Sequence, residues 1–187
     1  MRAIVGVLLG VMALMVSSCN VNVKKDNQGD DKNVDIKTPF AEIHVDQGAD
    51  VRDTGLPVYA GARVREKSGN QDKNANVNIS AFGYGVRVVA VEYESDDPPA
   101  KVLAFYQGQL KRYGNVLECR TSGTEYQMDH DSSGSQDLKC EGSNTGNTVE
   151  LKAGVKSNQH LVSVEPRGKG SNFALVYVHT RGKDDTI

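Results

Sequence analysis

Apolar and polar residues alternate along much of this chain, and the pattern predicts a series of β-strands. The clearest case is 148–155, where apolar side chains at the odd positions alternate with polar ones, as in a half-buried strand. Two further strands, 77–81 and 86–94, flank Gly83-Tyr84-Gly85 and are expected to form a hairpin. The second of them is apolar on both parities from Val88 to Val91, which suits a central strand that is covered at least partly on both faces.

Other short apolar runs complete the predicted sheet. They lie at 115–119, 160–165 and 173–179. The segment 42–45 also alternates, and we expect an edge strand there because the nearby Pro39 cannot donate a ladder hydrogen bond.

One segment, about 98–113, has the pattern of an amphipathic helix. Asp96 or Asp97 can cap its start, Pro98 suits the first helical position, and Gly114 can supply a left-handed residue at its end. Phe105 lies outside the apolar stripe and is expected to contact a loop or solvent. The stripe itself fills an arc of about 100° and consists of Val102, Leu103, Tyr106, Leu110 and Tyr113.

The order of these elements predicts an α+β fold, an antiparallel β-sheet with one major helix (about 98–113) packed on one face. We expect one globular domain over 36–180. The preceding stretch 19–35 is too polar to offset its ordering entropy and is expected to be a flexible tether, and 181–187 is expected to be a frayed tail.

The N-terminal segment predicts export. Arg2 precedes an uncharged apolar run from Ala3 to Val16, which is too short to span a bilayer but long enough for the apolar region of a signal peptide. Residues 1–18 are therefore expected to be removed. The tetrapeptide Val16-Ser17-Ser18-Cys19 resembles the lipobox of bacterial lipoproteins, and the alternative is a secreted protein with a chance cysteine at this point.

The lipobox resemblance implies that Cys19 carries a diacylglycerol. Each buried CH₂ contributes roughly 0.8 kcal/mol, so two or three acyl chains hold a protein on a membrane without a spanning helix. The expected partner is thus a membrane, contacted through the N-terminal lipid. By resemblance to enterobacterial sorting, where Asp after the lipidated cysteine retains a lipoprotein in the inner membrane, Asn20 favours the outer membrane of the cell envelope.

The charge balance argues against a nucleic-acid partner. The chain has 22 Lys and Arg against 24 Asp and Glu residues, a net charge of −2, and loss of Arg2 with the leader makes it more negative. Binders of polyanions usually carry a basic stripe, whereas here both signs are interleaved throughout.

Cys119 and Cys140 form an even pair once Cys19 is assigned to lipid. In an exported chain, such a pair predicts a disulfide. A Cys/His metal site is the competing interpretation, but no C-x-x-C or H-x-x-x-H spacing supports it.

One loop has the oxygen spacing of a calcium site. Asp129, Asp131 and Ser133 occupy positions 1, 3 and 5, Gly134 occupies position 6, and Asp137 occupies position 9. Position 12 is Cys140 rather than Glu, and flanking helices are missing from the pattern. The alternative is a polar loop closed by the disulfide, and no other cofactor is expected.

Catalytic motifs are sparse. His44, His160 and His179 fall on predicted strands among polar neighbours and are expected to face solvent. The chain has no Gly-x-Ser-x-Gly elbow, no nucleotide-binding glycine loop and no spare cysteine for a Cys-His pair.

A second resemblance covers about residues 55–113. The turn Leu-Pro-Val-Tyr-Ala-Gly-Ala, a valine-rich strand and the helix segment Val-Leu-Ala-Phe-Tyr are similar to a pattern in uncharacterised bacterial secreted proteins and lipoproteins, with Ala60 where proline is commoner. It implies a shared fold and no catalytic residue.

We expect a lipid-anchored envelope protein that is a non-enzymatic binding or structural module. The alternatives are a small envelope hydrolase without a recognisable motif, and an envelope protein inhibitor or assembly factor with a protein partner.

Overall fold

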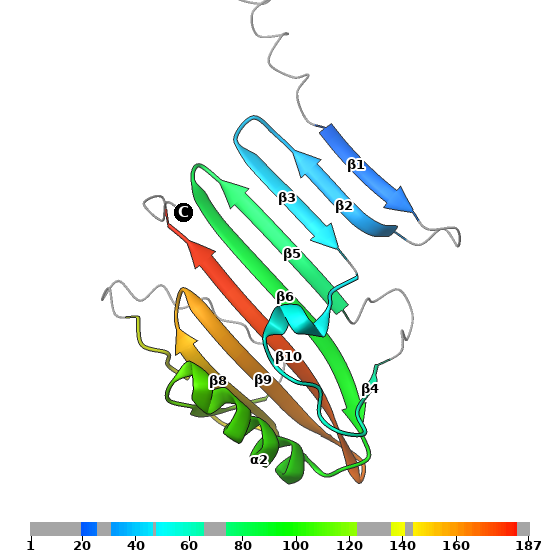
Figure 1. The fold of residues 1–187 in the computed structure, drawn as a ribbon, viewed down its shortest axis with the longest axis vertical. Coiled ribbons are helices and arrows are strands. Elements are labelled where there is room, and N and C mark those ends of the chain that lie inside the picture. Colours follow the sequence, from blue (N-terminus) through cyan, green and yellow to red (C-terminus); the bar gives the residue numbers. More distant parts are fainter. Residues whose placement is uncertain are drawn as a thin grey trace, which may run out of the picture.

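One large antiparallel sheet dominates the computed structural model, as Figure 1 shows. The structure describes residues 20–25, 31–46, 48–65, 74–122, 136–140 and 144–182, so the expected signal peptide and Cys19 lie outside the described residues. The strands are, in chain order, β1 (Asn20–Lys25), β2 (Asp31–Lys37), β3 (Ala41–Asp46), β4 (Arg63–Val64), β5 (Asn74–Ala81), β6 (Tyr84–Ser95), β7 (Leu117–Thr121), β8 (Thr148–Val155), β9 (Asn158–Arg167) and β10 (Gly170–Arg181).

The strand order across the sheet is β1-β2-β3-β5-β6-β10-β9-β8-β7, and the short β4 pairs with the end of β6. Every pairing is antiparallel, which confirms the α+β class in outline, with a larger share of sheet than the pattern predicts. The predicted hairpin is present between β5 and β6. Its two turn residues, Phe82 and Gly83, have φ values of 53° and 87°, as the mirror-image turns that suit a twisted hairpin require.

Helix α2 (Pro99–Leu110) continues into the 3-10 turn η3 (Lys111–Tyr113) and lies on one face of the sheet (Figure 1). We call this the front face. The N-terminus of α2 differs from the expected one. Pro98 occupies the capping position without a side-chain cap, and Asp97 instead accepts hydrogen bonds from Tyr59 and Lys101. Gly114 has a φ of 126° and a ψ of −156°, outside the expected left-handed helical conformation.

The core lies between α2 and the front of β6, β10, β9 and β8. Val102, Tyr106 and Leu110 of the predicted stripe are fully buried, which confirms the helical phase. Phe105 packs edge-on against the ring of Tyr59 in the loop before β4, as the pattern predicts. The remaining buried core residues are Leu56, Val91, Tyr93, Leu151, Ala153, Val162, Val164, Phe173 and Leu175.

Two expectations about the N-terminal region differ from the structure. The expected tether 19–35 contains strand β1 and most of β2, which extend the sheet beyond β3. As a consequence, β3 lies between β2 and β5 and is not an edge strand. Pro39 is compatible with this position because it lies in the turn between β2 and β3, outside the ladder.

The expected disulfide joins Cys119 of β7 to Cys140, with the two Cα atoms 5.4 Å apart. Cys119 pairs with Glu150 and therefore points to the back of the sheet, away from α2. The disulfide, and a hydrogen bond from the Lys156 amide to the Gln136 carbonyl, hold 136–140 at this end of the sheet. Lys152, one of the polar positions of the predicted half-buried strand, shares this face but is only 6% exposed, 3.4 Å from Glu150.

Among the residues that the structure describes, no helix is both long and apolar enough to cross a bilayer.

Candidate functional site

The expected calcium loop is described only in part. Asp129, Asp131 and Ser133 lie outside the described residues, and Asp137 is an exposed residue of the segment beside the disulfide. Within the described ranges, no group of three or more His, Cys, Asp or Glu side chains is arranged to hold a metal ion. Calcium binding by this loop therefore stays a prediction.

The histidines do not all face solvent as expected. His160 is buried, with its ring stacked 3.6 Å from that of Tyr113 and its Nδ1 2.8 Å from the Thr54 carbonyl oxygen. Burial lowers the pKa of His160 below its usual value. His44 is half-exposed and contacts the Asp35 carboxylate, and His179 is also only half-buried.

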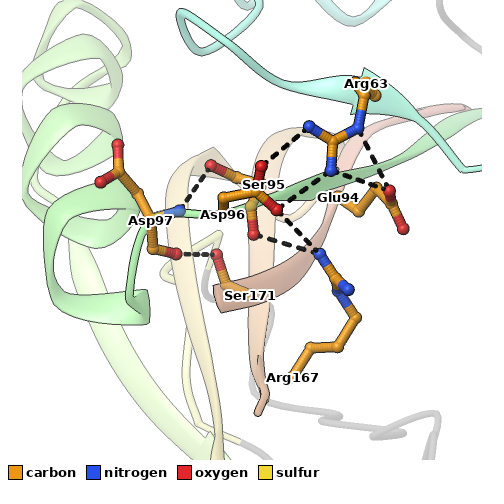
Figure 2. Close-up of polar contacts among 7 residues, drawn as sticks. All are labelled: Arg63, Glu94, Ser95, Asp96, Asp97, Arg167 and Ser171. Atoms are coloured by element: carbon orange, nitrogen blue, oxygen red, sulfur yellow. Dashed lines mark hydrogen bonds and ion pairs between the residues drawn. The ribbon is translucent and has the colours of Figure 1, made fainter. Parts of the chain in front are cut away.

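A charged cluster lies where β6 turns into α2, and Figure 2 shows it with the side chains labelled. The Arg63 guanidinium donates to Asp96 at 3.0 and 3.1 Å and to Glu94 at 3.2 and 3.3 Å. Arg167 approaches the same Asp96 carboxylate at 3.6 Å. Arg63 holds the pKa of Asp96 below its usual range, so this carboxyl stays ionised at neutral pH.

Two buried serines organise the backbone beside this cluster (Figure 2). The Ser95 hydroxyl accepts the Asp97 amide at 3.1 Å, and the Ser171 hydroxyl donates to the Asp97 carbonyl at 2.9 Å. The Asp97 carboxylate, in turn, accepts from Lys101 and Tyr59, which lower its pKa. These contacts satisfy the hydrogen-bonding groups at a strand-to-helix junction, so the cluster has a structural role.

The Leu-Pro-Val-Tyr segment that carries the second resemblance is also explained by packing. The fully buried Tyr106 hydroxyl accepts from the Tyr59 amide and donates to the Pro57 carbonyl, both at 3.1 Å. Leu56 is buried in the core, and the Tyr59 ring contacts Phe105 and Phe173 edge-on. The motif therefore fastens the loop before β4 onto α2.

Within the described part of the chain, packing leaves the back of the outer strands unexplained. Cross-strand register places one apolar residue after another on this side: Ile36 pairs with Ile43, Ile43 with Ile79, and Ile79 with Val86. We call this surface the apolar face; it consists of Val34, Ile36, Ile43, Val45, Ala75, Val77, Ile79, Val86, Val88, Ala90, Val176 and Val178.

None of these side chains is buried. Ile79 is 42% and Val86 39% exposed, and the rest of the apolar face is half-buried by neighbours on the same sheet. The contrast within β6 is direct, since Val89 and Val91 on the front are 0% and 2% exposed, whereas Val88 on the back is half-buried, so the strand is fully covered on one face and partly covered on the other. Among the described helices and strands, the main contacts of β2 and β3 are with neighbouring strands, and α2 lies on the front.

The front of the same outer strands is polar. One cross-strand row there reads Asp35, His44, Asn78, Arg87 and His179. Arg87 lies 3.4 Å from Asp53 of the 3-10 turn η2 (Val51–Thr54), which packs over β6 and β10. The apolar side of the sheet therefore changes along the strand order. It is the front where α2 covers the sheet, and it is the back in the outer strands, which extend beyond the helix.

A continuous apolar surface of this kind marks an interaction site on a folded protein. Sequence reasoning did not identify it, although the signal is present as period-two alternation in each outer strand. Alternation shows that one side of a strand is apolar. Whether another segment covers that side depends on elements that are distant in the chain.

No protein-family model matches this chain, and comparison with curated proteins and with solved structures found no similar protein.

Proposed function

We propose that this chain is a lipid-anchored protein of the cell envelope, on the outer membrane, that acts as a non-enzymatic structural or binding module. We further propose that it works through its apolar face, which pairs with the same face of a second copy. The anchor rests on Val16-Ser17-Ser18-Cys19, and the pairing rests on the back of β2, β3, β5, β6 and β10, which no described helix covers.

The chemistry of the apolar face favours a second copy as its occupant. The face carries no charged side chain, so a partner chosen by charge complementarity has nothing to recognise there. Its β-branched side chains on a pleated surface resemble one inner layer of a β-sandwich, in which two sheets pack about 10 Å apart. An identical face supplies the second layer.

The size of the face is of the right order. Five strands spaced by ~4.8 Å, each about seven residues long at ~3.3 Å per residue, give a flat area of roughly 550 Å². The protruding side chains add further surface to this value. A stable interface buries about 800 Å² on each partner, so the apolar face supplies most of the required area. Anchored copies share one membrane plane, which raises their effective concentration for pairing.

Other observations support a module without an active site. General acid–base catalysis at neutral pH needs groups whose pKa lies near neutrality. Among the described residues, the carboxyl groups with shifted pKa, those of Asp50, Asp96 and Asp97, shift downward, and that of Asp50 falls to about 2 beside Arg52. His160, whose pKa is lowered by burial, lies inside the protein with its ring stacked on Tyr113. In the charged cluster of Figure 2, the carboxylates of Glu94 and Asp96 are both paired with Arg63.

The test is the oligomeric state of the processed chain, residues 19–187 with Cys19→Ala, measured by sedimentation. We expect a dimer, and we expect Val86→Asp to weaken it by on the order of 100-fold, because an unpaired carboxylate buried in an apolar interface costs several kcal/mol. Val155→Asp is the matched control, since Val155 is 43% exposed but lies on the front face.

A chain that stays monomeric at every attainable concentration would contradict the proposal, as would a dimer that Val86→Asp leaves intact. Binding of the monomer to lipid or detergent through this face would assign the face to lipid instead, and would also contradict self-pairing.

A further inference from the structure

The most exposed large apolar side chains gather at one end of the sheet. Phe82 is 71% exposed, Phe40 67% and Tyr84 59%. The rings of Phe40 and Phe82 stack with centroids 5.9 Å apart, although they belong to two different turns, β2–β3 and β5–β6. We call these three residues the aromatic tip.

The turns that carry the aromatic tip are uncharged. The β2–β3 turn consists of Thr38, Pro39 and Phe40, and the β5–β6 turn consists of Phe82 and Gly83. The nearest described charges, the Lys37–Glu42 ion pair and Arg181, lie one row further back in the sheet. An uncharged apolar end with basic and acidic groups set behind it suits the boundary between acyl chains and headgroups, where aromatic side chains are enriched.

Strand register places the start of β1 at the same end. Asn20 pairs with Lys37, Lys37 with Glu42, and Glu42 with Ser80, and one further pair, Ala41 with Ala81, separates this row from the β5–β6 turn. Cys19 directly precedes Asn20, and one residue extends at most about 3.6 Å. The start of β1, to which the expected lipid attachment point Cys19 is directly bonded, therefore lies at the end of the sheet that carries the aromatic tip, as the course of β1 in Figure 1 also shows.

The opposite end of the sheet has the opposite character. Strand β6 runs from Tyr84 at the aromatic tip to Glu94 and Ser95 in the charged cluster of Figure 2. At ~3.3 Å per residue its length is roughly 40 Å. The molecule is thus polarised along its strands, with aromatic rings at one end and Arg63, Asp96 and Arg167 at the other.

From this arrangement we infer that the aromatic tip inserts into the bilayer that holds the Cys19 lipid, and that the sheet stands upright on the membrane with the charged cluster outward. The partner of this surface is the acyl and headgroup boundary of a phospholipid layer. The inference rests on the proposed lipid anchor and is independent of pairing through the apolar face.

The absence of tryptophan from the chain permits a direct test. The full chain, lipidated at Cys19 and carrying Phe82→Trp, is reconstituted into phosphatidylcholine vesicles. We expect tryptophan emission at shorter wavelength than in water, and quenching by lipids brominated on their acyl chains. Val64→Trp is the control, because Val64 is 50% exposed in β4 and pairs near the far end of β6.

The outcomes separate the anchor from the tip. A chain that floats with the vesicles but whose Phe82→Trp emission is unquenched, or quenched no more than that of Val64→Trp, would overturn the insertion while the anchor stands. A chain that does not float would overturn the anchor and the inference that rests on it. If Phe82→Trp does not fold, Phe40→Trp on the other turn makes the same test.

Discussion

The hydroxyl of Tyr106 joins the loop before β4 to helix α2, and its removal gives a sharp test of that junction. Tyr106→Phe keeps the buried ring, which is 0% exposed, and removes only the oxygen. The Tyr59 amide then loses its acceptor and the Pro57 carbonyl loses its donor.

The two losses differ in cost. Pro57 is exposed, so its carbonyl can turn to water, whereas Tyr59 is half-buried against Phe105 and Phe173. Leaving a buried donor unsatisfied costs about 1–3 kcal/mol, and we expect Tyr106→Phe to lower the free energy of unfolding by about 2 kcal/mol. For a domain of this size, that corresponds to a fall in Tm of about 4–8 °C.

Urea unfolding followed by circular dichroism measures the change. Tyr84→Phe is the matched control, because it removes the same atom from a side chain that is 59% exposed and should change stability by less than about 0.5 kcal/mol. Equal effects of Tyr106→Phe and Tyr84→Phe would refute the bridging role of the hydroxyl. A change in the urea m-value would instead indicate a change in the folded or denatured ensemble.

Two further predictions concern the helix and a buried histidine. Leu110→Ala should destabilise the domain by about 2–5 kcal/mol because Leu110 is fully buried. The control Lys111→Ala, at an exposed neighbouring residue, should cost less than about 0.5 kcal/mol. Similar urea midpoints for the two variants would contradict the packing of α2. Burial lowers the folded-state pKa of His160 below 6.5, so the unfolded chain binds the proton more tightly and stability should fall as the pH drops from 6.5 through the folded pKa. His160→Phe should flatten this part of the stability profile, and an unchanged slope in that variant would assign the pH dependence to other groups.

The sequence predicts the elements whose signals are local. Alternation finds the β5–β6 hairpin and β8, and the spacing of Val102, Tyr106 and Leu110 finds the helix and its buried stripe. Strands β1 and β2 were missed because Asn, Asp and Lys occupy every second position there. Their composition resembles that of a solvated tether, although the period of two between Val34 and Ile36 is present.

Features that depend on distant pairing were not predictable in this way. His160 is buried among segments that are distant in the chain: the carbonyl oxygen of Thr54, 106 residues away, accepts a hydrogen bond from its ring Nδ1, and the Tyr113 ring stacks on it. The apolar face follows from strand order, which brings β10 from the C-terminal part of the chain beside β6. Alternation in a single strand cannot show which of its sides another segment covers.

The pairing of β10 with β6 also determines when this fold can be completed. Ser171 pairs with Ser95 and Arg181 with Gly85, so the seam between the two halves of the sheet joins residues that are far apart in sequence. Hairpins such as β5–β6 close over short loops, but loop-closure entropy delays contacts of this separation. Under the proposed export, a chain that emerges from a translocation channel N-terminus first would carry β6 with an open edge until β10 arrives, and only then would the sheet become continuous.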